Sequence, residues 1–223
     1  MRFLTVALLL LLSPLPAAPS SFAQALDAKT DDATKKTDAR PAQELYEDAN
    51  GYLGRRYQEF NKKKLPYDPK LEAQTKKEQH ELAVKNAGIL KARSPLSSED
   101  LYYLGMLHHL AGDADAALLT MRQLLKDDPD GRQAQAARNV VVLYAIKKDL
   151  INEAVAAVEA YARHQPQDPD DRFRMELLLT DAFLRAKNYP AMGAHAQQML
   201  EAAKEFGKTK KDQAFRRDEM LLK

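Results

Sequence analysis

Residues 98–129 constrain the fold most strongly, because two helical patterns there flank a turn of only two residues. Ser97 and Asp100 have the spacing of a capping box, which marks the start of the first helix. Gly112 tolerates the positive φ at which helices often end, and Asp113 caps the amides that follow. The segment therefore predicts two antiparallel helices joined by a tight turn.

The order of residues in this segment resembles the tetratricopeptide repeat. The matching residues are Leu101, Leu104, Gly105, His108, Gly112, Asp113, Ala117, Leu125 and Pro129. His108 stands where the family usually has a tyrosine, whose ring packs between helices. The resemblance implies a stack of helical hairpins with a surface for binding a protein or peptide, and it identifies neither the partner nor a reaction.

The pattern recurs with a longer spacing than the family standard. Ala117 and Ala154 are 154 − 117, or 37, residues apart, and so are Pro129 and Pro166. Because the standard period is about 34 residues, a short insertion is needed, most simply at residues 127–133. These positions predict a second copy of the repeat.

The later copies depart from the pattern at identifiable positions. Val142 stands where a small residue is usual, and Asp149 replaces the turn glycine. In the third copy Thr180 replaces the small residue, and no closing proline follows. Its large inward side chains are expected at Leu179, Phe183 and Tyr189, facing Met192, Ala196 and Leu200.

These observations together predict an all-α protein. We expect an N-terminal helical hairpin over residues 41–96, with a first helix of about five turns and a second from Asp68 to about Arg93. Repeats follow at about residues 98–130, 135–167 and 173–205, and a partial helix ends the chain. Residues 97–223 are thus interpreted as a TPR-like antiparallel helix-hairpin solenoid of about three and a half hairpins, whose last apolar face is not covered by a capping repeat.

The N-terminus has the composition of a secretory signal peptide. Arg2 supplies the positive charge, and residues 3–12 form an apolar run that is too short to span a membrane. Cleavage is expected after Ala23 or Ala25, so residues 1–25 are assigned to the signal. Residues 26–40 are polar and lack apolar periodicity, which predicts a disordered spacer. The mature protein is therefore expected in the periplasm or the secreted fraction, without a membrane anchor.

The amino-acid composition excludes several kinds of functional site. The chain has no cysteine, so disulfides, thiolate metal sites and redox dithiol motifs are excluded. Its formal net charge is +2, and its lysine clusters are interspersed with acidic residues, as on solvated helix faces. We expect no nucleic-acid partner.

The resemblance also implies which residues face a binding groove, because the first helix of each repeat lines the concave side. The implied groove residues are Tyr102, Tyr103, Met106, His109, Leu110, Asn139, Val140, Leu143, Ile146, Leu177, Leu178, Asp181 and Leu184. This set is mainly apolar, which favours an amphipathic helix or an extended apolar peptide. The alternative is a groove filled by the protein's own first two helices or by further helices downstream.

No pattern in the sequence points to catalysis or to a metal ion. Adjacent helical residues point about 100° apart, so His108 and His109 cannot bind one ion together. His80, His164 and His195 are expected to be isolated and exposed. The sequence lacks a nucleophile elbow, a phosphate-binding glycine loop and the HExxH motif, so we expect a non-enzymatic protein without a cofactor.

A second resemblance leaves an alternative function open. The segments 45–67, 100–105 and 172–176 resemble the helical region that precedes a thioredoxin-like domain in certain exported bacterial proteins. This resemblance implies an accessory region that positions a redox domain or its client, with the catalytic domain outside this chain. Two hypotheses follow: an exported peptide-binding scaffold, or an accessory region of a redox protein.

Overall fold

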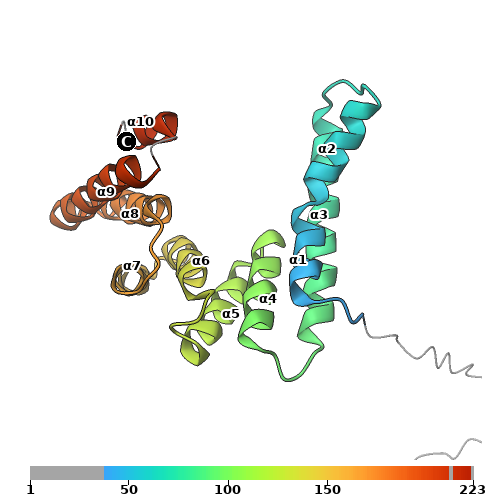
Figure 1. The fold of residues 1–223 in the computed structure, drawn as a ribbon, viewed down its shortest axis with the longest axis horizontal. Helices are drawn as coiled ribbons and strands as arrows, with labels where there is room; N and C mark the ends of the chain where they lie inside the picture. Colours follow the sequence, from blue (N-terminus) through green and yellow to red (C-terminus); the bar gives the residue numbers. More distant parts are fainter. Residues whose placement is uncertain (1–37, 211–212, 222–223) are drawn as a thin grey trace, which may run out of the picture. The chain divides into compact units, whose positions relative to one another are not determined.

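The computed structural model describes residues 38–210 and 213–221, which form ten α-helices and no strand (Figure 1). The predicted all-α class is therefore confirmed, whereas the signal peptide and residues 26–37 of the spacer lie outside the described residues. The helices are α1 (Ala42–Asn50), α2 (Tyr52–Lys62), α3 (Pro69–Lys91), α4 (Ser98–Leu110), α5 (Ala114–Asp127), α6 (Ala134–Lys147), α7 (Ile151–Arg163), α8 (Pro169–Arg185), α9 (Tyr189–Thr209) and α10 (Ala214–Leu221). In the described part of the chain, no helix is both long and apolar enough to cross a membrane.

Side-chain caps start several helices, among them α3, α4 and α8. The Asp68 and Asp168 carboxylates accept hydrogen bonds from the second amide of α3 and α8, each over 2.8 Å, and a proline follows each cap. Ser97 and Asp100 form both bonds of the capping box at the start of α4. These short-range signals fix where the helices begin because they satisfy amides that have no partner within the helix.

Four helices end in the same left-handed conformation. Lys64, Gly112, Asp149 and Lys187 have φ values of 52°, 65°, 60° and 56°. In each case the amide of the next residue bonds back to the carbonyl five residues earlier, as in the bond of 2.9 Å from Asp113 to His108. This is the Schellman arrangement. The turn is therefore the same after α2, α4, α6 and α8, although only one of the four residues is glycine.

The predicted first helix is divided at Gly51, where ψ is −7°. The carbonyl groups at the end of α1 are satisfied by side chains, because Gln79 donates to Ala49 over 3.0 Å and Arg55 donates to Asp48 over 2.7 Å. Glycine is a poor helix former, and these side-chain donors replace the bonds that a continuous helix would make. The expectation of one five-turn helix was wrong, and the 41–96 hairpin contains three helices.

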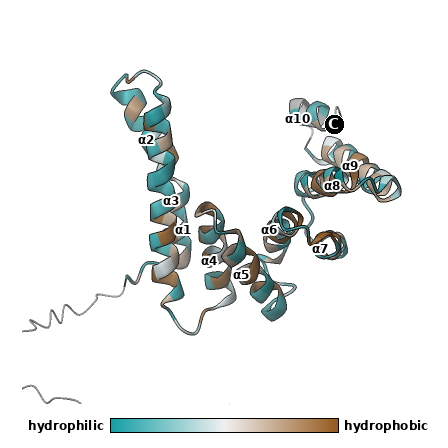
Figure 2. Ribbon diagram, turned by 180° about the vertical axis from the view of Figure 1, so that it is seen from behind, coloured by the Kyte–Doolittle hydropathy of each residue, from teal (hydrophilic) through white to brown (hydrophobic). Residues whose placement is uncertain are grey.

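Helices pack mainly against their neighbours in sequence. The pairs α4–α5, α6–α7 and α8–α9 are in contact, and α5–α6 and α7–α8 join one pair to the next. Leu118, Met121, Val142, Tyr161 and Leu179 belong to one buried cluster that spans α4 to α8. Figure 2 shows the hydrophobic residues along α6 and α7. This packing is compatible with a helical repeat.

Two further clusters lie on either side of the central one. Leu45 and Ala49 of α1 pack with Leu90 of α3 and Leu107 of α4. At the other end, Phe173, Met199, Phe206 and Met220 join α8, α9 and α10. Met220 is only 2% exposed, so α10 covers part of the apolar face that was expected to be uncovered.

The first repeat requires a small residue at Gly105 because a larger one would collide with the facing helix. A Cβ atom at Gly105 would lie 2.6 Å from Met121 Cε, which is buried. The positions 37 residues further on hold Val142 and Val158, both buried in the same cluster. The second pair thus combines a larger residue in its first helix with a smaller one in its second, which explains how Val142 is accommodated.

In the third helix pair, α8 and α9, two of the residues that were expected to point inward are exposed. Leu179 is fully buried, but Tyr189 is 59% exposed and Leu200 is 38% exposed. Tyr189 is the first residue of α9, directly after the Asn188 cap. Tyr189 is therefore exposed at the start of α9 rather than packed inward.

We predict that glycine at the other left-handed turns stabilises the protein. Lys187→Gly and Asp149→Gly should raise the free energy of unfolding by about 0.5–1 kcal/mol, with the larger gain for lysine, because aspartate tolerates this conformation better. Urea denaturation measures the change. Ala186→Gly is the matched control, because Ala186 is right-handed with φ −75°, and it should lose about 0.5–1 kcal/mol. A loss for Lys187→Gly equal to that of the control would contradict the assignment.

We also predict that the Gly105 position depends on its partner. Gly105→Val alone should cost about 1–3 kcal/mol through overpacking against Met121. Adding Met121→Val, which reproduces the second pair, should recover at least about 1 kcal/mol of that loss. Denaturation of both single variants and the double variant measures this coupling, and purely additive losses would disprove the compensation.

Candidate functional site

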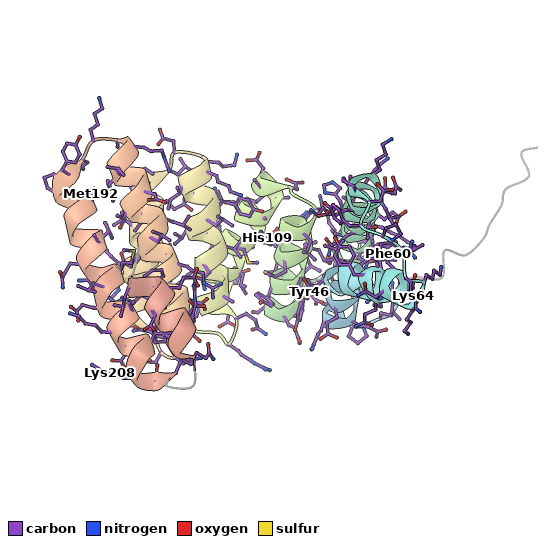
Figure 3. All side chains as sticks on the ribbon, turned by 90° about the horizontal axis from the view of Figure 1, so that it is seen from above. Tyr46, Phe60, Lys64, His109, Met192 and Lys208 are labelled. Atoms are coloured by element: carbon purple, nitrogen blue, oxygen red, sulfur yellow. The ribbon has the colours of Figure 1, made fainter. Side chains whose placement is uncertain are left out.

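The first helices of the three pairs line a groove of about 440 Å³. Its walls come from α4, α6 and α8, and His109 of α4 is labelled in Figure 3. The lining residues are Tyr102, Met106, His109, Ala136, Asn139, Val140, Leu143, Asp171, Arg174, Met175 and Leu178. Most of these side chains are apolar and partly buried, which is the composition of a surface for another apolar segment.

The structure brings together most of the predicted groove residues. Tyr102, Met106, His109, Asn139, Val140, Leu143 and Leu178 all line the groove. No residue of α1, α2 or α3 is among its lining residues, so in the described part of the chain the protein's own first helices do not fill it.

Other predicted groove residues lie elsewhere. Tyr103 points toward α1, where its ring centroid is 5.7 Å from that of Tyr46. Ile146 packs against the central cluster, and Asp181 is exposed outside the groove lining. Leu110 packs with the N-terminal cluster, and Leu184 is 51% exposed near the end of α8. These predicted residues therefore lie outside the groove lining.

Sequence reasoning missed the first two turns of α8. Asp171, Arg174 and Met175 line the groove together with Leu178. Their separations from Asp171, at three, four and seven residues, are those of one helix face. The Asp168 cap, which starts α8 at Pro169, provided the signal that this face begins before Leu177.

His109 is held in the groove by a contact between α4 and α6. Its Nδ1 atom lies 2.9 Å from the Tyr144 hydroxyl, and the two rings meet edge to face. Burial lowers the pKa of His109 below its ordinary value of 6.5, and the Lys147 ammonium group lowers it further. The lowered pKa favours the neutral imidazole at pH 7, which makes this part of the groove wall less polar.

The charged groups at the edge of the groove are paired with one another. Arg174 lies 3.1 Å from the Asp171 carboxylate and 2.7 Å from that of Asp170. Burial raises the pKa of Asp171, while Arg174 and a hydrogen bond from Asn139 oppose that rise. This edge can orient a ligand through polar contacts, but no strong unpaired charge enters the groove.

A smaller hollow of about 270 Å³ adjoins the groove, because Tyr102 and Ala136 line both. Its remaining lining residues are Gln43, Glu99, Tyr103, Arg132 and Gln133. Gln43 is contributed by α1. The apolar groove thus continues into a more polar hollow beside the N-terminal helices.

The prediction that His80, His164 and His195 are isolated and exposed was only partly correct. His80 is exposed, as expected. His195 is not isolated, because its Nδ1 atom lies 2.7 Å from the buried carboxylate of Glu176 and its ring stacks on Phe183. His164 lies 2.8 Å from Asp130. Among the described residues, no three histidine, aspartate or glutamate side chains gather in a way that could hold a metal ion.

Comparison with protein-family models gives no match, and comparisons with curated proteins and with solved structures give none either. The likeness to tetratricopeptide repeats therefore depends on the residues and the helix packing described above. The family and the function remain proposals.

We predict that the protein loses stability as the pH falls from 7 to 5. His109 and His108 both have a pKa lowered by burial. The unfolded chain takes up protons near pH 6.5, whereas the folded protein resists them until a lower pH, so acid favours unfolding. His109→Gln should reduce this pH dependence when urea denaturation is measured at several pH values. His80→Gln is the control, because His80 is exposed, and equal slopes for both variants would contradict the prediction.

Proposed function

We propose that this protein is a TPR-like scaffold that binds a protein or peptide segment in the groove formed by α4, α6 and α8. One observation carries the proposal: the first helices of three successive pairs contribute apolar side chains to one continuous, solvent-open groove. A stable monomer gains nothing from leaving such a groove uncovered, so a bound segment is the simplest explanation.

The groove favours an amphipathic helix as its ligand. Met106, Leu143, Met175 and Leu178 offer contacts to apolar side chains, and methionine adapts its shape to different partners. Tyr102 adds a large aromatic surface with a polar end. The polar face of a bound helix would lie toward solvent and toward the Arg174 edge. Helix-in-groove recognition of this kind uses anchors at three- and four-residue spacing.

We propose a binding role and not an enzymatic one. His109 and Asp171 are the titratable groups in the groove that could transfer a proton. However, His109 lies against Tyr144, and Asp171 is bonded to Asn139 and Arg174. The contacts with Tyr144 and Asn139 connect α4 and α8 to α6, and the Arg174 contact lies within α8. These interactions support a structural role for both side chains.

Export to the periplasm or the secreted fraction belongs to the same proposal. It is supported by the signal-like composition of residues 1–25. The partner would then be another exported protein or a segment of one.

The groove can be tested with peptides selected from a displayed library of amphipathic helices. Selected peptides should bind the wild-type protein, and Tyr102→Ser with Leu143→Ser should weaken binding at least about tenfold, because each change removes apolar contact area. Isothermal titration calorimetry measures the affinity. Leu119→Ser is the matched control, because Leu119 is 67% exposed on α5 and outside the groove lining.

Equal affinities for the groove variant and the wild type would reject the groove as the binding site. Circular dichroism should show unchanged helix content for all variants, since Tyr102 and Leu143 are only partly buried. A second readout replaces Leu143 with a photo-cross-linking amino acid. The cross-link to the selected peptide should form there and should be absent when the same amino acid replaces Leu119.

A further inference from the structure

A second hollow, of about 370 Å³, lies at the turn between α2 and α3. Phe60 and Lys64 are labelled at this turn in Figure 3. Its lining residues are Tyr57, Phe60, Asn61, Leu65, Pro66, Tyr67, Asp68, Leu71 and Glu72. The hollow is formed entirely within the α2–α3 hairpin and shares no lining residue with the groove of α4, α6 and α8.

Three of the aromatic and aliphatic side chains of this hollow are exposed to solvent. Tyr67 is 79% exposed, Leu65 is 44% exposed and Tyr57 is 36% exposed. No residue of α2 is buried, and in the described part of the chain α2 packs mainly against α3, with only slight contact to α1. Apolar side chains concentrated on a partnerless hairpin end indicate a surface for another molecule.

Hydrogen bonds, ion pairs and a cation–π contact hold several side chains around the hollow. The Tyr67 hydroxyl donates to Glu72 over 2.8 Å, and Lys76 pairs with the other oxygen of that carboxylate. Arg56 lies over the Phe60 ring, 5.2 Å from its centroid, and pairs with Glu59. The acidic side chains Glu59 and Glu72 are therefore engaged with residues of the hairpin itself.

The cations beside the hollow, in contrast, have no partner. Lys62, Lys63 and Lys64 are exposed, and no ion pair involves them among the described residues. They lie between Asn61 and Leu65, which both line the hollow. Residues 55–78 contain eight lysines and arginines and four acidic residues, a formal charge of +4, whereas the whole chain carries +2 and the remainder therefore −2. This hairpin is therefore one of two strongly basic stretches of the chain, the other being residues 204–217, which also carry a formal charge of +4.

We propose that this hollow binds an acidic peptide segment that inserts one apolar side chain between Tyr57, Leu65 and Tyr67. The carboxylates of the segment contact Lys62, Lys63 and Lys64. Binding here is independent of the proposed groove and adds a second interaction surface of opposite character. The apolar anchor supplies affinity, and the lysines supply charge selection and faster association.

The arrangement of charge favours a peptide over an anionic membrane. Asp68 and Glu72 lie on the rim, on the chain segment that follows the three lysines. A continuous anionic surface would meet these carboxylates together with the lysines, whereas a peptide can place its acidic residues on the lysine side only. A concave hollow also accepts an inserted side chain better than it inserts into lipid.

The test uses a fluorescein-labelled peptide with a central leucine followed by four glutamates, measured by fluorescence anisotropy with the full chain. We expect saturable binding that weakens as salt rises from about 50 to about 200 mM, because exposed charges are screened. Replacing the leucine with serine should weaken binding about tenfold. Replacing the glutamates with lysines should abolish it.

Variants of the protein test the two parts of the surface separately. Lys62→Gln with Lys63→Gln should weaken binding about fivefold, and Tyr67→Ser should weaken it about tenfold. Lys64 is left unchanged because its left-handed conformation makes substitution a test of the turn as well. The control is Lys85→Gln with Lys91→Gln, which removes the same charge from exposed positions on α3 outside the hollow and should bind like the wild type.

Three results would overturn the proposal. One is equal affinity of the Lys62/Lys63 variant and its Lys85/Lys91 control. Another is equal affinity for the leucine and serine peptides. The third is binding to vesicles of anionic phospholipid, but not to the peptide. Leu143→Ser, which alters only the groove, should leave peptide binding at the hairpin unchanged, so failure of one surface is distinguishable from failure of the other.

Discussion

The structure depends on one backbone conformation, repeated at Gly112, Asp149 and Lys187. A single left-handed residue ends the first helix of each pair, and the residue after it is already the N-cap of the second helix. The chain therefore reverses within two residues, which holds the two helices of a pair in direct contact. Because each pair is closed in the same way, the first helices of successive pairs recur at equivalent positions, and their free faces can together form the groove.

The same helices provide both the core and the groove, and Val140 and Met175 belong to both. α6 places Val141, Val142 and Ala145 in the central cluster, while Asn139 and Leu143 face the groove. A change of packing in the core would therefore move groove residues as well. In the first pair, α4 and α5, a small Gly105 faces a large Met121. In the second pair, α6 and α7, the equivalent residues are Val142 and Val158. The two helices of each pair therefore remain in contact although the residues differ. Because the contact is preserved although the residue types differ, α4, α6 and α8 can together line the groove.

Local signals predicted helix boundaries well, because capping residues act within one turn of their own position. The conformations of Asp149 and Lys187 were harder to predict, since neither is glycine and the turn is imposed by packing of the flanking helices. Tyr103 and His195 were misplaced for a related reason: their neighbours, Tyr46 and Glu176, come from other helices. The groove was predicted in outline because it follows helix periodicity, and its α8 portion was missed because the third copy was aligned too late.

The groove and the α2–α3 hollow differ in chemistry. The first is mainly apolar with paired charges at its edge, and the second combines exposed aromatic rings with three exposed lysines. If both proposals hold, the two surfaces would distinguish an apolar helix from an acidic segment, whether these belong to one partner or to two.

The central claim is that α4, α6 and α8 form one binding surface, and methyl-labelled nuclear magnetic resonance tests it most directly. On titration with a selected amphipathic peptide, the methyl resonances of Met106, Leu143, Met175 and Leu178 should shift together with one dissociation constant, while that of Leu119 should stay unchanged. Shifts confined to one helix, or shifts of Leu119 without those of Leu143 and Leu178, would contradict the account.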